Sequence, residues 1–174
     1  MMLFGCNKYD QHGNTIYTIK KDKHRSTNKI KTTRDNFLPF LVTFDESAVY
    51  TTIDPNNQYD INKLFGLSDC RTTHTANSIR LGWRWSNDSL QIHWFKHEEG
   101  EFSFSFLKEI EINKTYEAFI IINDNNYVIG FDDAVDTIPR SCGVRTDNIK
   151  YYLWPYFGGD ETAPHTIKIK IKEL

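Results

Sequence analysis

The feature that most constrains this chain is a two-residue alternation of apolar and polar side chains, which dominates the sequence from Ser78 onward. Such alternation is typical of β-strands with one buried face, because successive strand side chains point to opposite sides of a sheet. Two runs, 79–85 and 90–97, are separated by Asn87-Asp88, which favours a hairpin turn. The side chains that we expect to face inward from these runs are those of Ile79, Leu81, Trp83, Trp85, Leu90, Ile92 and Trp94.

Three later segments extend the strand pattern. Residues 101–106 alternate Phe with Ser, which predicts a half-buried strand, whereas 116–122 is almost continuously apolar and predicts a central strand covered on both faces. In 165–172 the isoleucines are expected inside and the lysines outside, an arrangement that discourages edge pairing if the strand is peripheral. Strands are also expected at 15–20, 37–44, 127–131 and 150–157.

One short helix is predicted at Asp60–Phe65, where Asp60 could cap the first turn and Gly66 could end the helix. The remaining pattern of short strands and turns predicts an all-β, antiparallel two-sheet sandwich of the jelly-roll type. With 39% hydrophobic and 14% aromatic residues, the 174-residue chain can bury a substantial core. We expect residues 15–174 to form a single domain and 1–14 to be an N-terminal tail or the remnant of a lipoprotein signal.

The net charge and its distribution along the chain indicate which kinds of partner the protein could bind. A net charge of −2 and a pI near 6.3 disfavour a dedicated nucleic-acid binder. The segment Lys20–Arg34, however, contains seven basic residues and one acid, Asp22. This basic segment is either an ordinary solvated region or a contact for an anionic polymer such as an acidic polysaccharide.

The three cysteines, Cys6, Cys70 and Cys142, lack the close spacing of a zinc or redox motif, and Cys70 with Cys142 is the one disulfide that could form within the domain. Leu3–Cys6 resembles the end of a bacterial lipoprotein signal, in which the cysteine is lipidated, although the preceding apolar stretch is missing. Lipidation of Cys6 would attach the protein to a membrane. We therefore expect a cell-envelope or secreted location.

Two longer segments carry a family resemblance: Asn77–Trp85, which reads NSIRLGWRW, and Leu153–His165, which reads LWPYFGGDETAPH. With Ile19–Ser26, they resemble a group of small bacterial lipoproteins and secreted proteins of unassigned function. The resemblance covers most of the chain after about Thr15, and it implies a concanavalin A-like (LamG-like) β-sandwich. Folds of this kind commonly bind or cleave sugars on a concave sheet, but a fold alone does not fix a function.

The polar side of the predicted hairpin offers a candidate ligand site. Arginine pairs with carboxylate or sulfate groups, and glutamine and histidine bond hydroxyls. Aromatic rings can stack on the apolar faces of sugars, and Trp154, which is followed by Pro155, is the preferred platform. The candidate ligand-binding residues are Arg80, Arg84, Gln91, His93, His97, Trp154 and Tyr156.

Two enzymatic alternatives stay open beside binding. Gln91-Ile92-His93 resembles the Gln-Ile-His motif of alginate-lyase-type sandwiches, which implies a lyase that uses Gln91, His93, Arg84 and Tyr156. The tyrosine-bearing segment of that family is absent from this sequence. A jelly-roll glycoside hydrolase would need paired acids, for which Glu109 and Glu111 are weak candidates at a strand end.

No metal or other cofactor is expected. The loop at 158–161 and the acids Asp132, Asp133 and Asp136 could offer oxygens to structural calcium, but neither has the spacing of a calcium-binding loop. His24, His74 and His165 lack the i, i+4 spacing of a zinc site, and His93 and His97, which have it, are expected to lie far apart along a strand. The sequence thus favours a lectin-like carbohydrate-binding protein over an enzyme, the third alternative being a surface protein that meets a protein partner through the basic segment.

Overall fold

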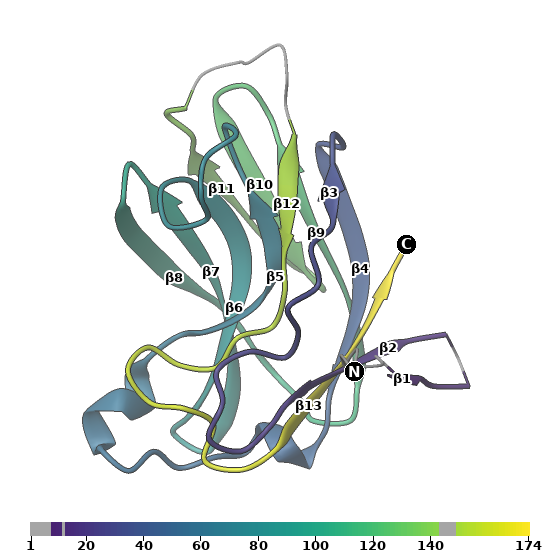
Figure 1. Cartoon of the computed structure of the whole chain (residues 1–174), viewed down its shortest axis with the longest axis vertical. Helices are drawn as coiled ribbons and strands as arrows, with labels where there is room; N and C mark the ends of the chain where they lie inside the picture. The colour runs from purple at the N-terminus through teal and green to yellow at the C-terminus, as the bar shows by residue number, and fades with distance from the viewer. Residues whose placement is uncertain (1–7, 12, 143–148) are drawn as a thin grey trace, which may run out of the picture.

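The computed structural model describes residues 8–11, 13–142 and 149–174, and it confirms the predicted all-β jelly-roll sandwich (Figure 1). Two antiparallel sheets pack face to face, and strands far apart in sequence are neighbours within each sheet. The seven-stranded sheet has the order β1 (Lys8–Tyr9), β2 (Thr15–Ile19), β13 (Ile167–Glu173), β4 (Phe37–Phe44), β9 (Thr115–Ile122), β10 (Asn126–Phe131) and β11 (Ala134–Pro139). The six-stranded sheet has the order β3 (Thr32–Thr33), β12 (Lys150–Leu153), β5 (Asn62–Ser68), β6 (Ser78–Ser86), β7 (Ser89–Glu98) and β8 (Glu101–Ile110).

The core lies between the two sheets and follows the alternation of β6 and β7. All the residues expected to face inward from these strands contribute to it, and Trp85 and Trp94 pack at its margin, partly buried. Trp83 is fully buried and meets Phe44 of the opposite sheet, with 5.4 Å between ring centroids. The predicted hairpin also forms, because Ser86 pairs with Ser89 across the turn.

The prediction of a helix at Asp60–Phe65 was wrong. The described residues hold two short 3₁₀ turns instead, η1 (Glu46–Ala48) and η2 (Pro55–Tyr59), and Asp54 caps η2 by accepting a hydrogen bond from the Asn56 amide. Residues 62–68 form β5 in the middle of the sheet. Gly66 does not end a helix: it lies against β6 so closely that a Cβ atom there would come within 2.3 Å of the Ile79 carbonyl oxygen. Pairing with β6 therefore overrides the local capping signal.

Two strand predictions need correction, and a third is confirmed. Residues 101–106 form part of edge strand β8 and are exposed throughout, so their phenylalanines are not buried in the core. β9 is central in its sheet, as predicted, but only alternate residues are buried and it is not covered on both faces. β13 buries Ile167, Ile169 and Ile171, as predicted. Because it lies between β2 and β4, its lysines have no free strand edge to protect.

Two further features concern the cysteines and the N-terminal segment. Cys70 and Cys142 form a disulfide, with 6.2 Å between their Cα atoms. The short strand β1 lies within the predicted tail, 1–14, and pairs with β2. The lipidation prediction at Cys6 falls outside the described residues. Within the described part of the chain, no helix is long and apolar enough to cross a membrane.

Candidate functional site

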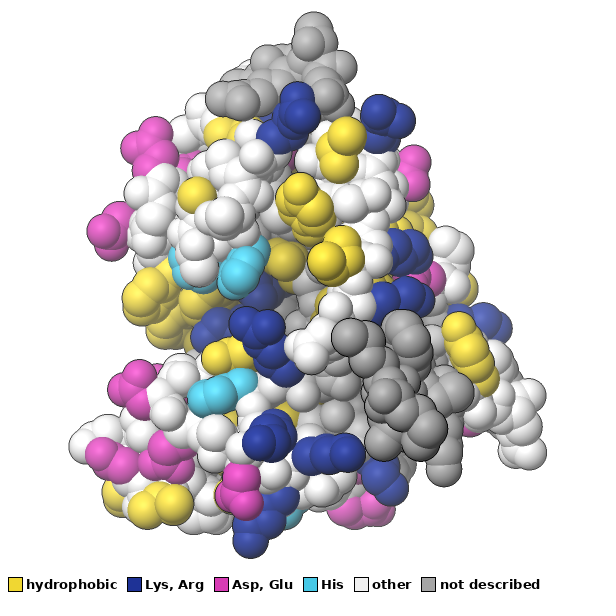
Figure 2. Space-filling view, in the orientation of Figure 1, with side chains coloured by type: hydrophobic (Ala, Val, Ile, Leu, Met, Phe, Trp, Pro, Cys, Tyr) yellow, Lys and Arg dark blue, Asp and Glu magenta, His cyan; other side chains and the backbone are white. Residues whose placement is uncertain are grey.

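The outward side of the six-stranded sheet, here called the open face, is defined by three cross-strand rows. Each row contains one residue from each of β5, β6, β7 and β8, because residues directly opposite one another in antiparallel strands point to the same side of the sheet. The rows are Ser68, Ser78, His97 and Phe102; Gly66, Arg80, Phe95 and Phe104; and Lys63, Gly82, His93 and Phe106. Figure 2 shows Lys, Arg and His side chains gathered around a hollow in the face in view, with hydrophobic side chains at its edge.

One margin of the open face is an aromatic strip formed by Phe102, Phe104 and Phe106 on β8. These side chains are 62%, 44% and 51% exposed. Phe95 of β7 continues the strip inward, because its ring stacks on those of Phe102 and Phe104 at centroid distances of 5.6 and 6.2 Å. Neighbouring exposed aromatic side chains are costly in water and are characteristic of a binding surface.

The interior of the open face carries two cations. Arg80 is only 6% exposed, its Nε atom has no hydrogen-bond partner, and no carboxylate forms an ion pair with it among the described residues. Burial lowers its pKa to about 10. Lys63 lies in the adjacent row, and burial, reinforced by the charge of Arg80, lowers its pKa to about 8.

Two histidines complete this surface. His93 is 2% exposed and neither ring nitrogen meets a hydrogen-bond partner at normal geometry. Burial and, secondarily, Arg84 lower the pKa of His93 to about 4. Burial, followed by Arg80, also lowers the pKa of His97 to about 4. Both rings are therefore neutral at neutral pH, and Nδ1 of His97 lies 3.5 Å from the Ser78 hydroxyl oxygen.

Three other predicted ligand residues, Arg84, Gln91 and Tyr156, lie on the same side of the sheet. Arg84 and Gln91 bind each other, Arg84 Nε donating to Gln91 Oε1 at 2.8 Å. Tyr156 extends the third row through bridges to Lys63 and Arg25. Arg25 belongs to the basic segment, so the bridge to Tyr156 brings part of that segment beside the open face.

Trp154 lies apart from this constellation. Its ring packs against Tyr17 and Phe65 at centroid distances of 5.5 Å, and its Nε1 donates to the Lys29 carbonyl oxygen at 2.6 Å. Because Phe65 faces the core, Trp154 closes the margin of the sandwich and is not a platform on the open face. Its position next to a proline and a glycine pair gave no information about which side of the sheet it faces.

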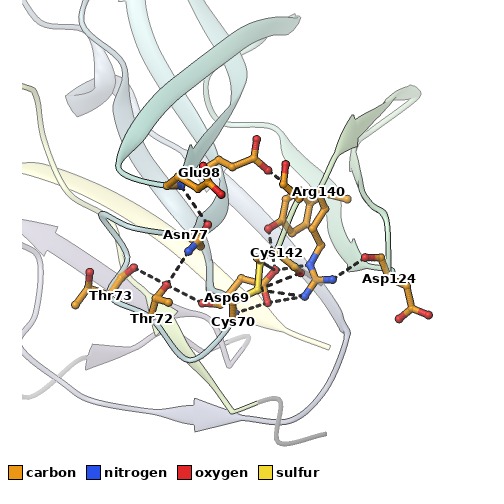
Figure 3. The surroundings of a disulfide bond; sticks show 12 residues. Asp69, Cys70, Thr72, Thr73, Asn77, Glu98, Asp124, Arg140 and Cys142 are labelled. Atoms are coloured by element: carbon orange, nitrogen blue, oxygen red, sulfur yellow. Dashed lines mark hydrogen bonds and ion pairs between the residues drawn. A yellow bond between two sulfur atoms is a disulfide. The ribbon is translucent and has the colours of Figure 1, made fainter. Parts of the chain in front are cut away.

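A pocket of about 350 Å³ adjoins the first row and is formed largely by the loop between β5 and β6. The disulfide anchors the start of this loop, and a buried ion pair lies beside it (Figure 3). There Asp69 accepts hydrogen bonds from Arg140 Nε at 2.6 Å and Tyr127 Oη at 2.8 Å. The residues that line the pocket are Ser68, Arg71, Thr72, Thr73, His74, Tyr151 and Leu153.

The groups that could hold a metal are already engaged in the structure. Asp69, Cys70 and Cys142 lie together, but the disulfide removes the thiolates that a soft metal needs. The carboxylate of Glu161 accepts hydrogen bonds from the Ile53 and Asp54 amides. In the other acidic turn, Asp132 and Asp133 pair with Lys108, and Asp136 accepts from Trp94 Nε1 at 2.7 Å.

The open face also lacks the arrangement that glycoside hydrolysis needs. β5 and β6 contain no Asp or Glu, and the one acid of β7, Glu98, pairs with Lys96. Glu109 is engaged with Ser89 at 3.0 Å near the end of β8. Two carboxylates on opposite sides of a bound sugar are therefore not available in the described part of this face.

A lyase would need His93 and a tyrosine within hydrogen-bond reach of one another or of a shared sugar carbon. His93 and Tyr156 share one side of the same sheet, but two strands lie between them. Three strand spacings separate their backbones by about 14 Å, and among the described residues no hydrogen bond or ring contact joins the two side chains. Tyr156 instead stacks on His24 at a centroid distance of 5.1 Å.

Sequence reasoning missed Lys63 and the aromatic strip. Lys63 lay within the predicted helix, and the Phe-Ser alternation of β8 was taken as a half-buried pattern with no role in a site. The absence of acids from β5 and β6 was a readable signal, since arginine and lysine on these two neighbouring strands cannot pair with a carboxylate of either strand.

Comparison with known proteins supports the fold. No family model matches the sequence, and no curated protein matches it. The structure is similar to LamAcat from Zobellia galactanivorans, with a TM-score of 0.58, 11% identity, and coverage of 95% of this chain and 77% of the other. It is also similar to the alginate lyase AlyC3, with a TM-score of 0.59, 10% identity, and coverage of 94% and 74%. A glycoside hydrolase family 16 endo-glucanase from Bacteroides ovatus gives a TM-score of 0.56, 11% identity, and coverage of 95% and 87%. At these identities the likeness establishes a concanavalin A-like jelly-roll sandwich.

Proposed function

We propose that this protein is a glycan-binding module whose ligand lies across the open face of the six-stranded sheet. The observation that carries the proposal is the exposed aromatic strip at Phe102, Phe104 and Phe106, next to Arg80 Nε and the His93 ring nitrogens, which find no hydrogen-bond partner among the described residues. Phenyl rings can pack against the apolar faces of sugar rings, while Arg, Lys and neutral His bond oxygen atoms of the ligand. Ligand sites typically combine an apolar surface with a few polar groups that orient the ligand.

Binding without catalysis is the form of this proposal that the geometry supports best. The carboxylate pair of a hydrolase and the His–Tyr contact of a lyase are both missing from the described part of the open face. The structures of LamAcat, AlyC3 and the endo-glucanase support the proposal only through their fold.

An extracellular or cell-envelope location is part of the proposal. The supporting observation is the Cys70–Cys142 disulfide, because such bonds persist chiefly in oxidising compartments. Membrane attachment through a lipidated Cys6 would add an anchor. Mass spectrometry of the protein isolated from its native membrane fraction tests the anchor, since a lipid adduct at Cys6 supports it and an unmodified thiol contradicts it.

The test of glycan binding compares two exposed phenylalanines. Phe104→Ala removes the middle of the aromatic strip, whereas Phe37→Ala removes a ring that is 54% exposed on the other sheet. On an array of neutral and acidic glycans, we expect the wild-type chain and Phe37→Ala to bind and Phe104→Ala to lose about ten-fold in affinity. Equal binding by the two variants, or no binding by the wild type, would contradict the proposal.

An absorbance assay for unsaturated sugar products accompanies the array. A bound glycan that stays intact supports a binding module. Product formation that His93→Ala abolishes would replace the module with a lyase.

A further inference from the structure

We propose that the open face contains an oxyanion subsite, formed by Arg80, Lys63 and His97 around the ring of Phe95, and that the glycan it binds carries carboxylate or sulfate groups. This inference rests on the proposed glycan-binding function and names the class of ligand. An ionised oxygen of the ligand would supply the counter-charge that Arg80 lacks among the described residues.

The first step of the argument is the cost of burying Arg80. A guanidinium that leaves water without an acid partner loses several kcal/mol of solvation, so buried arginines are normally paired. Arg80 is 6% exposed, and its Nε finds no acceptor. Although burial lowers its pKa to about 10, the group remains charged at neutral pH. The protein therefore holds a desolvated positive charge directed at the surface on which we place the ligand.

The second step is that Lys63 approaches the same ring. Lys63 Nζ lies 4.5 Å and Arg80 Cζ lies 6.0 Å from the centroid of Phe95. The one hydrogen bond made by the ammonium group within the described residues is a long one, 3.5 Å, to the Gly158 carbonyl oxygen. Asp60 offsets the repulsion between these two cations only in part, since the pKa of Lys63 stays lowered to about 8. An anion bound between them would remove it.

The third step concerns His97, which belongs to the neighbouring row. The charged or titratable groups that face it are Arg80 on β6, Lys63 on β5 and His74 in the loop before β6, whereas β8 presents the Phe102 ring. No acid faces His97 from these elements. An anion bound beside it would reverse the electrostatic bias and favour the protonated ring, so binding should take up protons.

The ligand oxyanion could come from a uronate carboxylate or from a sulfate ester, since arginine binds both through paired N–H groups. Polygalacturonate and its fully methyl-esterified form share one backbone and differ in the carboxylate, while dextran sulfate and dextran differ in the sulfate. Titration calorimetry of the full chain with these four polymers identifies the source. We expect one of the charged polymers to bind at least about ten-fold more tightly than its neutral counterpart.

Matched variants locate the subsite. Arg80→Met and Lys63→Met each remove one of the two cations, and Lys168→Met removes an exposed lysine from β13 of the other sheet. We expect a loss of about ten-fold or more for the first two and less than about two-fold for the third. Because two variants test the subsite independently, misfolding of one, monitored by circular dichroism, does not remove the test.

The outcomes separate this inference from the proposed function. If the neutral polymers bind as tightly as the charged ones and Arg80→Met has no effect, the subsite is wrong and glycan binding stands. If no glycan binds, both are wrong. Calorimetry near pH 6 in two buffers of different ionisation enthalpy should reveal proton uptake, and its absence would overturn the role of His97.

Discussion

Two buried arginines in this domain have opposite surroundings. Arg140, beside the disulfide, donates from Nε and Nη2 to the Asp69 carboxylate at 2.6 and 3.2 Å and from Nη1 to the Asp124 carbonyl oxygen at 2.8 Å (Figure 3). Its pKa is raised, chiefly by these bonds to Asp69. Arg80, on the open face, is as buried but has no acid partner, and its pKa is lowered by burial.

We interpret Arg140 as a charge that stabilises the fold and Arg80 as a charge that binds a ligand. The Arg140 charge is neutralised inside the fold, so removing it leaves a buried carboxylate unpaired. The Arg80 charge is neutralised by nothing in the described structure, so the free domain gains little from keeping it. Stability measurements on the two sites, without any ligand, should therefore differ sharply.

The largest effect is expected at Arg140. Arg140→Met should lower the free energy of unfolding by about 3–5 kcal/mol, because the Asp69 side chain, which is 0% exposed, loses its ion-pair partner. Urea denaturation measures the change. The control is the double variant Arg140→Met with Asp69→Leu, which removes both charges and should recover much of the loss. If Arg140→Met has near-wild-type stability, the comparison between the two arginines fails.

The second effect concerns the disulfide beside the Arg140 ion pair. Replacing Cys70 and Cys142 together by serine should cost about 2–4 kcal/mol, because the bridge closes a long loop and restricts the unfolded chain. Urea denaturation under non-reducing conditions checks this value. In the Arg140→Met variant, loss of the disulfide should lower the free energy of unfolding by less, since the disulfide and the Arg140–Asp69 ion pair stabilise the same loop. Strict additivity would show that they act independently.

The sequence predicted the faces of β6 and β7 because a two-residue period, once one face is filled with Trp, Leu and Ile, leaves one arrangement that buries them. The same period could not orient β8. A register shift between Ile92 and His93 and an edge position turn Phe102, Phe104 and Phe106 away from the core. Alternation separates two faces, but it does not say which of them is covered.

The candidate site was partly predictable for a related reason. Arg80, His93 and His97 followed from the hairpin alternation, whereas Lys63 was hidden by a local capping signal that pairing with β6 overrides. Trp154 was misplaced because its side depends on contacts with Tyr17 and Phe65, which are distant in the sequence. Long-range packing thus decided every residue that the pattern assigned wrongly.

The buried ring of His93 should make the free energy of unfolding depend on pH. Burial lowers the pKa of His93 from 6.5 to about 4, so the ring is neutral in both folded and unfolded chains above pH 6.5. As the pH falls below 6.5, the unfolded chain binds a proton that the folded chain does not accept until about pH 4. His93 alone should therefore lower the free energy of unfolding by about 1.4 kcal/mol per pKa unit, to about 3 kcal/mol, and His97, whose pKa is also lowered to about 4, adds a second loss over the same pH range.

Urea denaturation between pH 7 and pH 4 measures this loss. His93→Gln should make the profile shallower by the His93 share and leave the share of His97. His165→Gln, at a ring that bonds the Ser47 carbonyl oxygen, serves as the matched control. A wild-type profile that His93→Gln leaves unchanged would contradict the assignment of the loss to His93.

The smallest effect is expected at Arg80 itself. Arg80→Met should change the free energy of unfolding by less than about 1 kcal/mol, because the lost contact with the Phe95 ring is offset by the removal of an unpaired buried charge. Urea denaturation of Arg80→Met and Arg140→Met compares the two sites directly, because the same side-chain change is made at each. If Arg80→Met proved as unstable as Arg140→Met, Arg80 would be a structural residue. Near-wild-type stability, in a variant that also binds charged polymers poorly, would show that the desolvated guanidinium is retained for a ligand and not for the fold.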